Sequence, residues 1–230
     1  MDVFPKTRRT RVRRAPKRAV YDRETVHAVL DAGLICHVGY VIDGQPYVTP
    51  TAYWREGERL YWHGSSASRM LRHLKGGVPV CFTVTHLDGL VLARSGFHHS
   101  INYRSVMAFG TAELVPHKDK LRLLDQFVEH LLPGRNAELR PPTAQELKAT
   151  TVLTMPLDEV SAKIRTGPPI DDEEDYAIPC WAGIVPITTV VGAPEADPRL
   201  MPGIAPPAYL DHFERFGWQR ADEVLGEAAD

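Results

Sequence analysis

Residues 34–54 read LICHVGYVIDGQPYVTPTAYW, and this stretch decides the fold class. Leu34 to Ile42 is a dense apolar run, which is typical of a buried strand. Asp43-Gly44 is a strong signal for a two-residue hairpin turn. Gln45 to Trp54 is then the returning strand. The stretch therefore predicts an antiparallel hairpin, the unit from which β-sandwiches and barrels are built.

Further short runs of β-branched and aromatic residues follow, separated by turn signals. Asp88-Gly89 predicts a second hairpin, between strands over Val80 to His86 and Leu90 to Arg94. The other expected strands are Arg59 to Trp62, one that begins near Tyr103, Thr150 to Leu157, Val160 to Arg165 and Gly183 to Val191. Strands and helices do not alternate regularly and no glycine-rich dinucleotide fingerprint is present, so a doubly wound fold is not expected.

Apolar residues at helical spacing and capping residues predict several helices around these strands. The expected helices run from Asp22 through Leu30, from Ser66 to Lys75, from His117 to Leu132, from Thr143 to Ala149 and from Tyr209 to Phe216. The pattern as a whole predicts a mostly β, α+β barrel with peripheral helices. We expect a basic N-terminal arm over 1–20, the barrel domain over 21–192 and a Pro-rich C-terminal extension with a short helix over 193–230.

Composition excludes several classes of protein. The chain has 230 residues, of which 43% are hydrophobic, enough for a real core. The formal net charge of −2 argues against a general nucleic-acid binder. No apolar run is long enough to span a membrane, and no apolar signal core follows the Arg-rich N-terminus. The three cysteines are widely spaced, which does not suggest a disulfide framework, so we expect a cytoplasmic protein.

The basic arm has two interpretations. It carries Lys6, Arg8, Arg9, Arg11, Arg13, Arg14, Lys17 and Arg18 against Asp2 alone. A solvated or partner-wrapping arm is favoured over a nucleic-acid-binding arm, because the rest of the chain supplies no basic face or nucleic-acid motif.

The stretch His63-Gly64-Ser65-Ser66-Ala67-Ser68-Arg69 carries the main chemical signal. It follows an expected strand and opens an expected helix, where unpaired N–H groups and the helix dipole favour an anion. Hydroxyl groups beside an arginine suit a phosphate group. The alternative is an ordinary serine N-cap before a helix, with Arg69 in a surface ion pair.

Further stretches complete a pattern that resembles a known family. They are Val20 to Arg23, Cys36 to Gly39, Thr49 to Thr51, the serine-arginine turn, Phe97 to Ser100, Asn102 to Val106, Ser161 to Pro169, Asp171 to Asp175 and Trp181 to Gly183. In these stretches the chain resembles the pyridoxamine-phosphate-oxidase-related flavoproteins with an FMN-binding split β-barrel, and in particular their nitroimidazole-reductase-like branch. The resemblance covers roughly residues 8 to 192.

The resemblance implies FMN as the cofactor and a set of residues that bind it. Ser65, Ser66, Ser68 and Arg69 would bind the phosphate, and Thr49, Pro50 and Thr51 would pass along the edge of the isoalloxazine ring. The remaining implied cofactor contacts are His63, Gly64, Tyr103, Arg104, Ser105 and Trp181. Met70 and Ser105 replace a lysine and a glutamine of the oxidase branch, and the C-terminal region lacks its closing arginine-histidine motif. Pyridoxamine-phosphate oxidase activity itself is therefore not expected.

Four residues are candidates for the substrate side of the site. His98 or His99 would line the pocket or donate a proton, although a loop histidine without a catalytic role is an equal alternative. Lys163 and Arg165 lie in stretches that, by the resemblance, close over the flavin of the partner subunit, and Arg165 would hold an anionic substrate. No metal site is expected, because no compact group of metal ligands appears in the sequence.

These residues lead to two functional hypotheses. The first is a homodimeric flavoprotein with FMN at the subunit interface, which transfers hydride from a nicotinamide donor through the flavin to a small acceptor. Such chemistry needs no protein nucleophile, and no catalytic residue is assigned. The second is a protein that binds flavin, haem or a deazaflavin without turnover, as a carrier or sensor.

Overall fold

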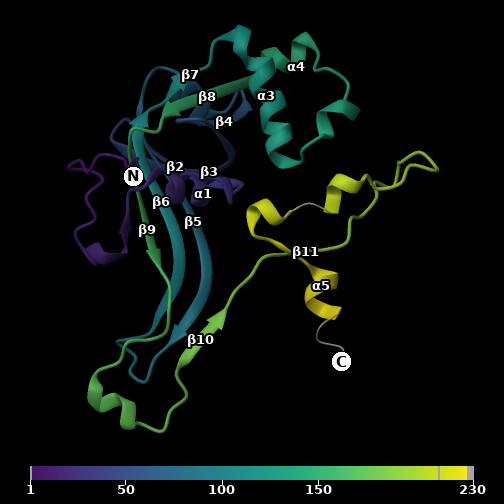
Figure 1. The fold of residues 1–230 in the computed structure, drawn as a ribbon. Helices are drawn as coiled ribbons and strands as arrows, with labels where there is room; N and C mark the ends of the chain where they lie inside the picture. Colours follow the sequence, from purple (N-terminus) through teal and green to yellow (C-terminus); the bar gives the residue numbers. More distant parts are fainter. Residues whose placement is uncertain (1, 212, 227–230) are drawn as a thin grey trace.

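The computed structural model describes residues 2–211 and 213–226, and its main feature is one large antiparallel sheet (Figure 1). The strand order is β1-β9-β6-β5-β2-β3-β4-β8-β7, and β10 pairs with β5 outside this path. The strands of this sheet are β1 (Ala19–Val20), β2 (Ile35–Ile42), β3 (Gln45–Glu56), β4 (Arg59–Ser65), β5 (Pro79–Leu92), β6 (Ser100–Thr111), β7 (Glu113–Leu114), β8 (Thr150–Pro156), β9 (Glu159–Arg165) and β10 (Gly183–Pro186). The sheet curls without closing, so the predicted mostly β, split-barrel class is confirmed.

The first predicted hairpin is confirmed. Asp43 and Gly44 have φ angles of 49° and 80°, as a two-residue turn of the mirror-image type requires. Directly outside this turn Ile42 pairs with Gln45, and the same register continues to the pair Ile35 and Ala52. The turn therefore sets which side chains of β2 and β3 face each other.

The second predicted hairpin is wrong. β5 runs straight through Asp88-Gly89 and pairs with β6 on both sides, with only a bulge between Leu87 and Gly89. The Asp88 carboxylate accepts a hydrogen bond from Arg104 of β6 at 2.8 Å. A Cβ on Gly89 would lie 2.9 Å from the carbonyl oxygen of Val185 in β10. The glycine at this position permits the close approach of a third strand rather than a turn.

The predicted helices within the barrel domain are confirmed, with shifts of a few residues at their ends. They are α1 (Arg23–Asp31), α2 (Arg69–Leu74), α3 (His117–Leu131) and α4 (Ala144–Ala149). Asp22 caps α1 by accepting from Thr25 N at 2.8 Å, and Thr143 forms a capping box with Glu146 on α4. Short 3-10 segments complete this part: η1 (Pro16–Arg18), η2 (Arg135–Glu138) and η3 (Glu173–Ala177).

The C-terminal part differs from its prediction. The strand expected over Gly183 to Val191 is split into β10 and β11 (Val190–Val191), and β11 pairs with β12 (Gln219–Arg220). In place of one helix over Tyr209 to Phe216 the structure has η4 (Ala208–Asp211) and η5 (Glu214–Phe216), followed by α5 (Ala221–Gly226); residue 212 lies outside the described residues. This extension returns to α3 and η2 (Figure 1), where the Tyr209 hydroxyl donates to Glu138 of η2 at 2.7 Å and Phe216 lies edge-on against His130 of α3. Tertiary contacts with α3, rather than helix propensity, therefore shape the segment.

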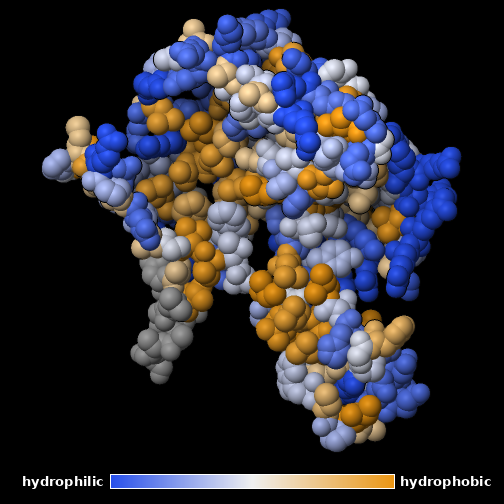
Figure 2. Space-filling view, turned by 180° about the vertical axis from the view of Figure 1, so that it is seen from behind, coloured by the Kyte–Doolittle hydropathy of each residue, from blue (hydrophilic) through white to orange (hydrophobic). Residues whose placement is uncertain are grey.

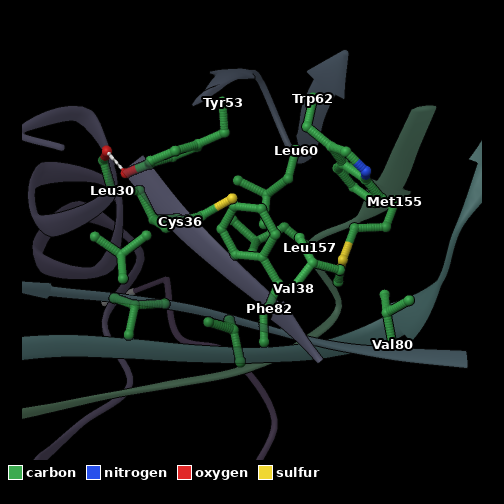
Figure 3. Close-up of a cluster of buried hydrophobic side chains, with 14 of the residues drawn as sticks. Leu30, Cys36, Val38, Tyr53, Leu60, Trp62, Val80, Phe82, Met155 and Leu157 are labelled. Atoms are coloured by element: carbon green, nitrogen blue, oxygen red, sulfur yellow. Dashed lines mark hydrogen bonds between the residues drawn. The ribbon is translucent and has the colours of Figure 1, made fainter. Parts of the chain in front are cut away.

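The main core fills the inside of the curled sheet. Figure 3 shows Tyr53, Trp62 and Phe82 converging from three strands, and the Tyr53 hydroxyl donates to the carbonyl oxygen of Leu30 in α1. A second, smaller core lies between the outer face of β3, β4 and β8 and helix α3, and consists of Trp54, Tyr61, Val115, Leu123 and Val152. Helix α3 is thereby fixed over the outer face of β4.

The N-terminal arm packs against its own barrel. Phe4 is 1% exposed, and its backbone N–H donates to Tyr21 O at 2.8 Å. Arg9 forms an ion pair with Glu159 and lies over the Phe109 ring, 5.6 Å from its centroid. At least part of the arm is thus held by the barrel rather than solvated. None of the helices in the described part of the chain combines the length and apolarity that a membrane span needs.

We predict that Gly44→Ala lowers the free energy of unfolding by about 1 to 2 kcal/mol, because alanine resists a positive φ. The added methyl group itself meets no atom within 4 Å, so the loss isolates backbone strain. Gly96→Ala is the matched control, because its Cβ also meets nothing and its φ is not positive. Urea unfolding of the two variants measures the difference, and equal stabilities would contradict the strained turn.

Candidate functional site

The serine-arginine turn lies between the end of β4 and helix α2. Its backbone N–H groups are largely occupied: Ser66 N donates to Ala149 O at 2.7 Å, Ser68 N to Ser65 O at 2.9 Å and Ala67 N to Ser65 Oγ at 3.2 Å. The side chain of Ser68 makes no capping hydrogen bond. An anion at this turn would therefore depend on side chains, with Arg69 as the charged one.

Arg69 rests on an aromatic ring. Its guanidinium carbon lies 4.4 Å from the ring centroid of Tyr47 in β3. Arg69 is exposed, and within the described part of the chain no hydrogen bond or ion pair engages its guanidinium. A fixed positive charge without a counter-ion is available to an anionic ligand.

The same contacts connect the turn to Thr49. Tyr47 stacks on Tyr40 of β2 with ring centroids 5.7 Å apart, and the Tyr40 hydroxyl lies 3.0 Å from Thr49 Oγ1. Arg69 and Thr49, which were predicted to bind opposite ends of one cofactor, thus belong to a single chain of contacts. The structure brings these two predicted segments together.

Pro50 and Thr51 continue along the same strand. β3 pairs with β4 only from Tyr53 to Glu56, so Pro50 has no strand on that side. This local edge accommodates a residue that lacks an N–H group. Pro50 is exposed, and the backbone oxygen of Thr51 accepts a weak bond from Cys36 Sγ at 3.4 Å.

His63 and Gly64 lie at the end of β4. The His63 ring is edge-on to Phe127 of α3, with centroids 4.5 Å apart, and its Nδ1 atom is buried without a hydrogen-bond partner. Burial lowers the pKa of His63, which keeps the imidazole neutral. A Cβ on Gly64 would lie 3.0 Å from a methyl group of Leu71, so this glycine allows α2 to approach β4.

Tyr103, Arg104 and Ser105 form a second group on β6. Arg104 forms an ion pair with Asp88, and the Ser105 hydroxyl donates to the carbonyl oxygen of Lys163 at 3.1 Å. β6 and β3 are separated by β5 and β2. Three inter-strand steps amount to about 14 Å along the sheet, so one chain does not bring this group to Arg69.

Arg165 is buried and holds its own loop. It is 6% exposed, and its Nη atoms donate to Asn102 Oδ1, to Gly167 O at 3.2 Å and to Pro168 O at 3.3 Å. Its Nε atom is buried without a hydrogen-bond partner. In this chain Arg165 faces its own loop, and its anion-binding role stays a prediction.

The remaining candidates lie at the far end of the β5–β6 strands. His98 Nε2 lies 3.3 Å from Asp172 Oδ2, and the ligand atoms of His98, Asp172 and Asp175 are all within 4.8 Å of one another at the surface. His99 Nδ1 lies 2.8 Å from Ser95 O, and Trp181 is 66% exposed. The expectation of no metal site stays a prediction.

A broad apolar surface runs over the outer face of the sheet. Figure 2 shows apolar surface around β10, on the part that projects below the rest of the molecule. The exposed apolar side chains on this face include Ile35, Val41, Val48, Leu87, Leu90, Ile101, Met107 and Val185. A cavity of about 690 Å³ between α3 and the segment 136–146 contains none of the predicted site residues. Tyr47 and Thr49 alternate with Val48 along β3, so their side chains lie on the opposite face, beside Tyr40.

Comparison with known proteins assigns the family. A family model described as pyridoxamine 5'-phosphate oxidase matches residues 22–164. The chain belongs to this family. The predicted site residues of this chain lie inside the matched region, apart from Arg165 and Trp181. No curated protein matches the chain.

Solved structures add relatives that cover nearly the whole chain. A flavocytochrome from Azotobacter vinelandii is 49% identical, with a TM-score of 0.85, over 89% of this chain and 95% of that one. An FAD and haem binding protein from Mycobacterium smegmatis is 40% identical, with a TM-score of 0.82, over 84% of this chain and 95% of that one. A candidate 5-nitroimidazole antibiotic resistance protein from Bacteroides thetaiotaomicron shares the fold at 21% identity and a TM-score of 0.53, over 64% and 86% of the chains.

Sequence reasoning missed Tyr40 and Tyr47. The two residues are placed symmetrically about the Asp43-Gly44 turn and are paired in register. Counting outward from the predicted turn would have placed their rings side by side. Asp88, which pairs with Arg104, and Asp171, which pairs with Arg94, had no such signal, because their positions depend on the bulge in β5 and on the loop after β9.

We predict that the stability of this family member falls as the pH drops below about 6.5. Burial lowers the pKa values of His63, His86 and His130, so the unfolded chain binds more protons than the folded chain in this range. His86→Gln removes one of these titrating groups and should flatten the fall in the free energy of unfolding. Gln also retains a donor for Val29 O, which lies 2.9 Å from His86 Nε2. Urea unfolding between about pH 7 and about pH 5 measures the slope.

The exposed His99 supplies the matched control. His99→Gln should leave the slope of the unfolding free energy against pH unchanged. If His86→Gln and His99→Gln behaved alike, burial of His86 would not be the cause of the pH dependence.

Proposed function

We propose that this protein is a flavin-dependent oxidoreductase that also binds haem. The observation that carries the proposal is its 49% identity to a flavocytochrome over 89% of the chain. The 40% identical FAD and haem binding protein supports the same pair of cofactors. A bound flavin supplies hydride and single-electron transfer, while the chain supplies binding, orientation and charge.

The residues around the serine-arginine turn suit a phosphorylated flavin. Arg69 offers an unpaired guanidinium, which pairs bidentately with phosphate oxygens. Thr49 lies three contacts away, through Tyr47 and Tyr40, where its hydroxyl and the adjacent backbone would meet the polar edge of the ring system. The hydroxyl groups of Ser66 and Ser68 would complete the phosphate contacts.

The form of the flavin follows from the relatives. The family resemblance implies FMN, whereas the Mycobacterium relative binds FAD. Both flavins carry the phosphate that Arg69 would bind. We favour FAD because that relative aligns with 84% of the chain, and the mass of the released chromophore distinguishes the two.

A homodimer would complete the site. Tyr103, Arg104 and Ser105 of β6 lie three inter-strand steps, about 14 Å, from β3 in the same chain, and Lys163 of β9 lies one step further. The exposed apolar sheet face, on which the side chains of Tyr103 and Ser105 lie, is of the kind that a protein partner covers. We infer that a second copy covers this face and brings its own β6 group, with Trp181, to the flavin at the interface.

A neutral imidazole nitrogen is a common axial ligand of haem iron. His63 Nδ1 and His130 Nε2 are buried and have no hydrogen-bond partner, and burial keeps both rings neutral. Arg215 lies beside His130 and donates to its carbonyl oxygen, so a further positive charge is disfavoured there. His63 is therefore the proposed axial ligand.

The reaction we propose takes hydride or electrons from a nicotinamide donor and passes them to a small acceptor. The alternative, a carrier or sensor without turnover, binds the same cofactors. Purified protein should show flavin and Soret absorption bands together, and steady oxidation of a nicotinamide donor would favour the enzyme. A protein that lacks both bands and takes up neither added cofactor would overturn the proposal.

We predict that Arg69→Ala weakens flavin binding by about 1.5 to 3 kcal/mol, or about 10- to 150-fold, the range for a hydrogen bond to a charged group. Fluorescence titration of the flavin-free chain with FMN and FAD measures the change. Arg72→Ala is the matched control, because Arg72 is an exposed arginine of the same helix. Equal affinities of the two variants would contradict a phosphate site at Arg69.

We predict that His63→Ala loses the Soret band of bound haem while flavin absorption remains. His130→Ala is the comparison and should keep both bands. Absorption spectra after haem reconstitution, with the haem content per chain, give the readout. Loss of haem in His130→Ala alone would move the ligand to α3, and retention in both variants would exclude these two histidines.

A further inference from the structure

Arg69 is an exposed arginine whose guanidinium lies over an aromatic ring. A free arginine side chain samples many rotamers, and a ligand that pairs with it must first restrict them. Here the guanidinium already lies over the Tyr47 ring at 4.4 Å. Its preferred position is therefore set before any anion arrives.

The platform under Arg69 is itself fixed. Tyr47 stacks on Tyr40 at an interplanar angle of 17°, and Tyr40 is buried with its hydroxyl against Thr49. The register of the β2–β3 hairpin places the two tyrosines directly opposite each other. The Tyr47 ring is thus held by a cross-strand pair and not by Arg69 alone.

Helix α2 contacts strand β2 of the same hairpin. His73 Nε2 lies 2.9 Å from the backbone oxygen of Val41, and the His73 ring lies 6.3 Å from that of Tyr40. The backbone that carries Arg69 and the ring that supports its guanidinium are therefore anchored to one hairpin. Such a double attachment fixes both ends of the arginine side chain.

We infer that Tyr47 is a positioning residue: its ring holds the Arg69 guanidinium in place for the phosphate group of the flavin. This inference rests on the proposed function and names a part of its site. Tyr47 acts through Arg69, so its effect is confined to ligands that carry a phosphate. Cation–π contacts at exposed sites correspond to about 2- to 5-fold in affinity.

The test compares three ligands that differ in the phosphate. The full chain, stripped of bound flavin, is titrated with riboflavin, FMN and FAD by flavin fluorescence. Tyr47→Leu should weaken FMN and FAD binding about 2- to 5-fold and leave riboflavin binding unchanged. Tyr47→Phe retains the aromatic face and should bind all three ligands like the unsubstituted chain. Once Arg69 is replaced by alanine, Tyr47→Leu should have no further effect.

Tyr176→Leu is the matched control. It removes a similar arginine–ring contact, that of Arg94 at 4.8 Å, at the other end of the sheet. Its flavin affinities should not change, and urea unfolding of each variant checks that the fold is kept.

Three results would overturn the inference. The first is an equal loss of affinity for riboflavin in Tyr47→Leu, which would place Tyr47 against the ring system. The second is a loss of FMN and FAD affinity in Tyr47→Phe as large as in Tyr47→Leu. The third is an additive effect of Tyr47→Leu and Arg69→Ala on FMN and FAD affinity. A chain that binds none of the three flavins before any substitution would overturn the proposed function and the inference with it.

Discussion

The register of the β2–β3 hairpin is the constraint on which the rest of the site depends. Asp43 and Gly44 both adopt positive φ angles, which fixes Ile42 opposite Gln45 and every pair above them. A slip of one residue would move each side chain of β3 to the other face of the sheet. Tyr47 would then leave Arg69, Thr49 would leave Tyr40, and Tyr53 would leave the core, where its ring packs against Phe82. One tight turn therefore serves both the barrel and the candidate cofactor site.

The two Asp-Gly pairs explain how far local sequence determines this fold. Both pairs have the composition of a two-residue turn, and only Asp43-Gly44 forms one. At Asp88-Gly89 the strand continues, since Arg104 pairs with Asp88 and β10 packs against the glycine. Those partners come from residues 104 and 185, which no local pattern around residue 88 reveals. The type of most elements could thus be predicted from the sequence, whereas a turn in competition with tertiary pairing could not.

The same distinction applies to the site. The serine-arginine turn was identified by residue type and the Thr49 strand by the family resemblance, and the structure places them together through Tyr40 and Tyr47. The burial of Arg165 could not be predicted in this way. An arginine near the end of a strand has the same sequence signature whether it meets solvent or folds back onto Asn102 and the carbonyl oxygens of residues 167 and 168. Burial decides between the two, and burial depends on how the loop after β9 closes.

The division of the candidate residues between two strand groups has a physical consequence. Tyr103 and Ser105 lie on the exposed apolar face of the sheet, whereas the Thr49 side chain lies on the opposite face, beside Tyr40. If a second copy covers that face, as we propose, the cofactor contacts both chains and binds only the paired state. Binding and association are then thermodynamically linked, so each stabilises the other by mass action. Apparent flavin affinity would depend on protein concentration, and the apolar face, which takes no part in the chemistry, would set how tightly the cofactor is held.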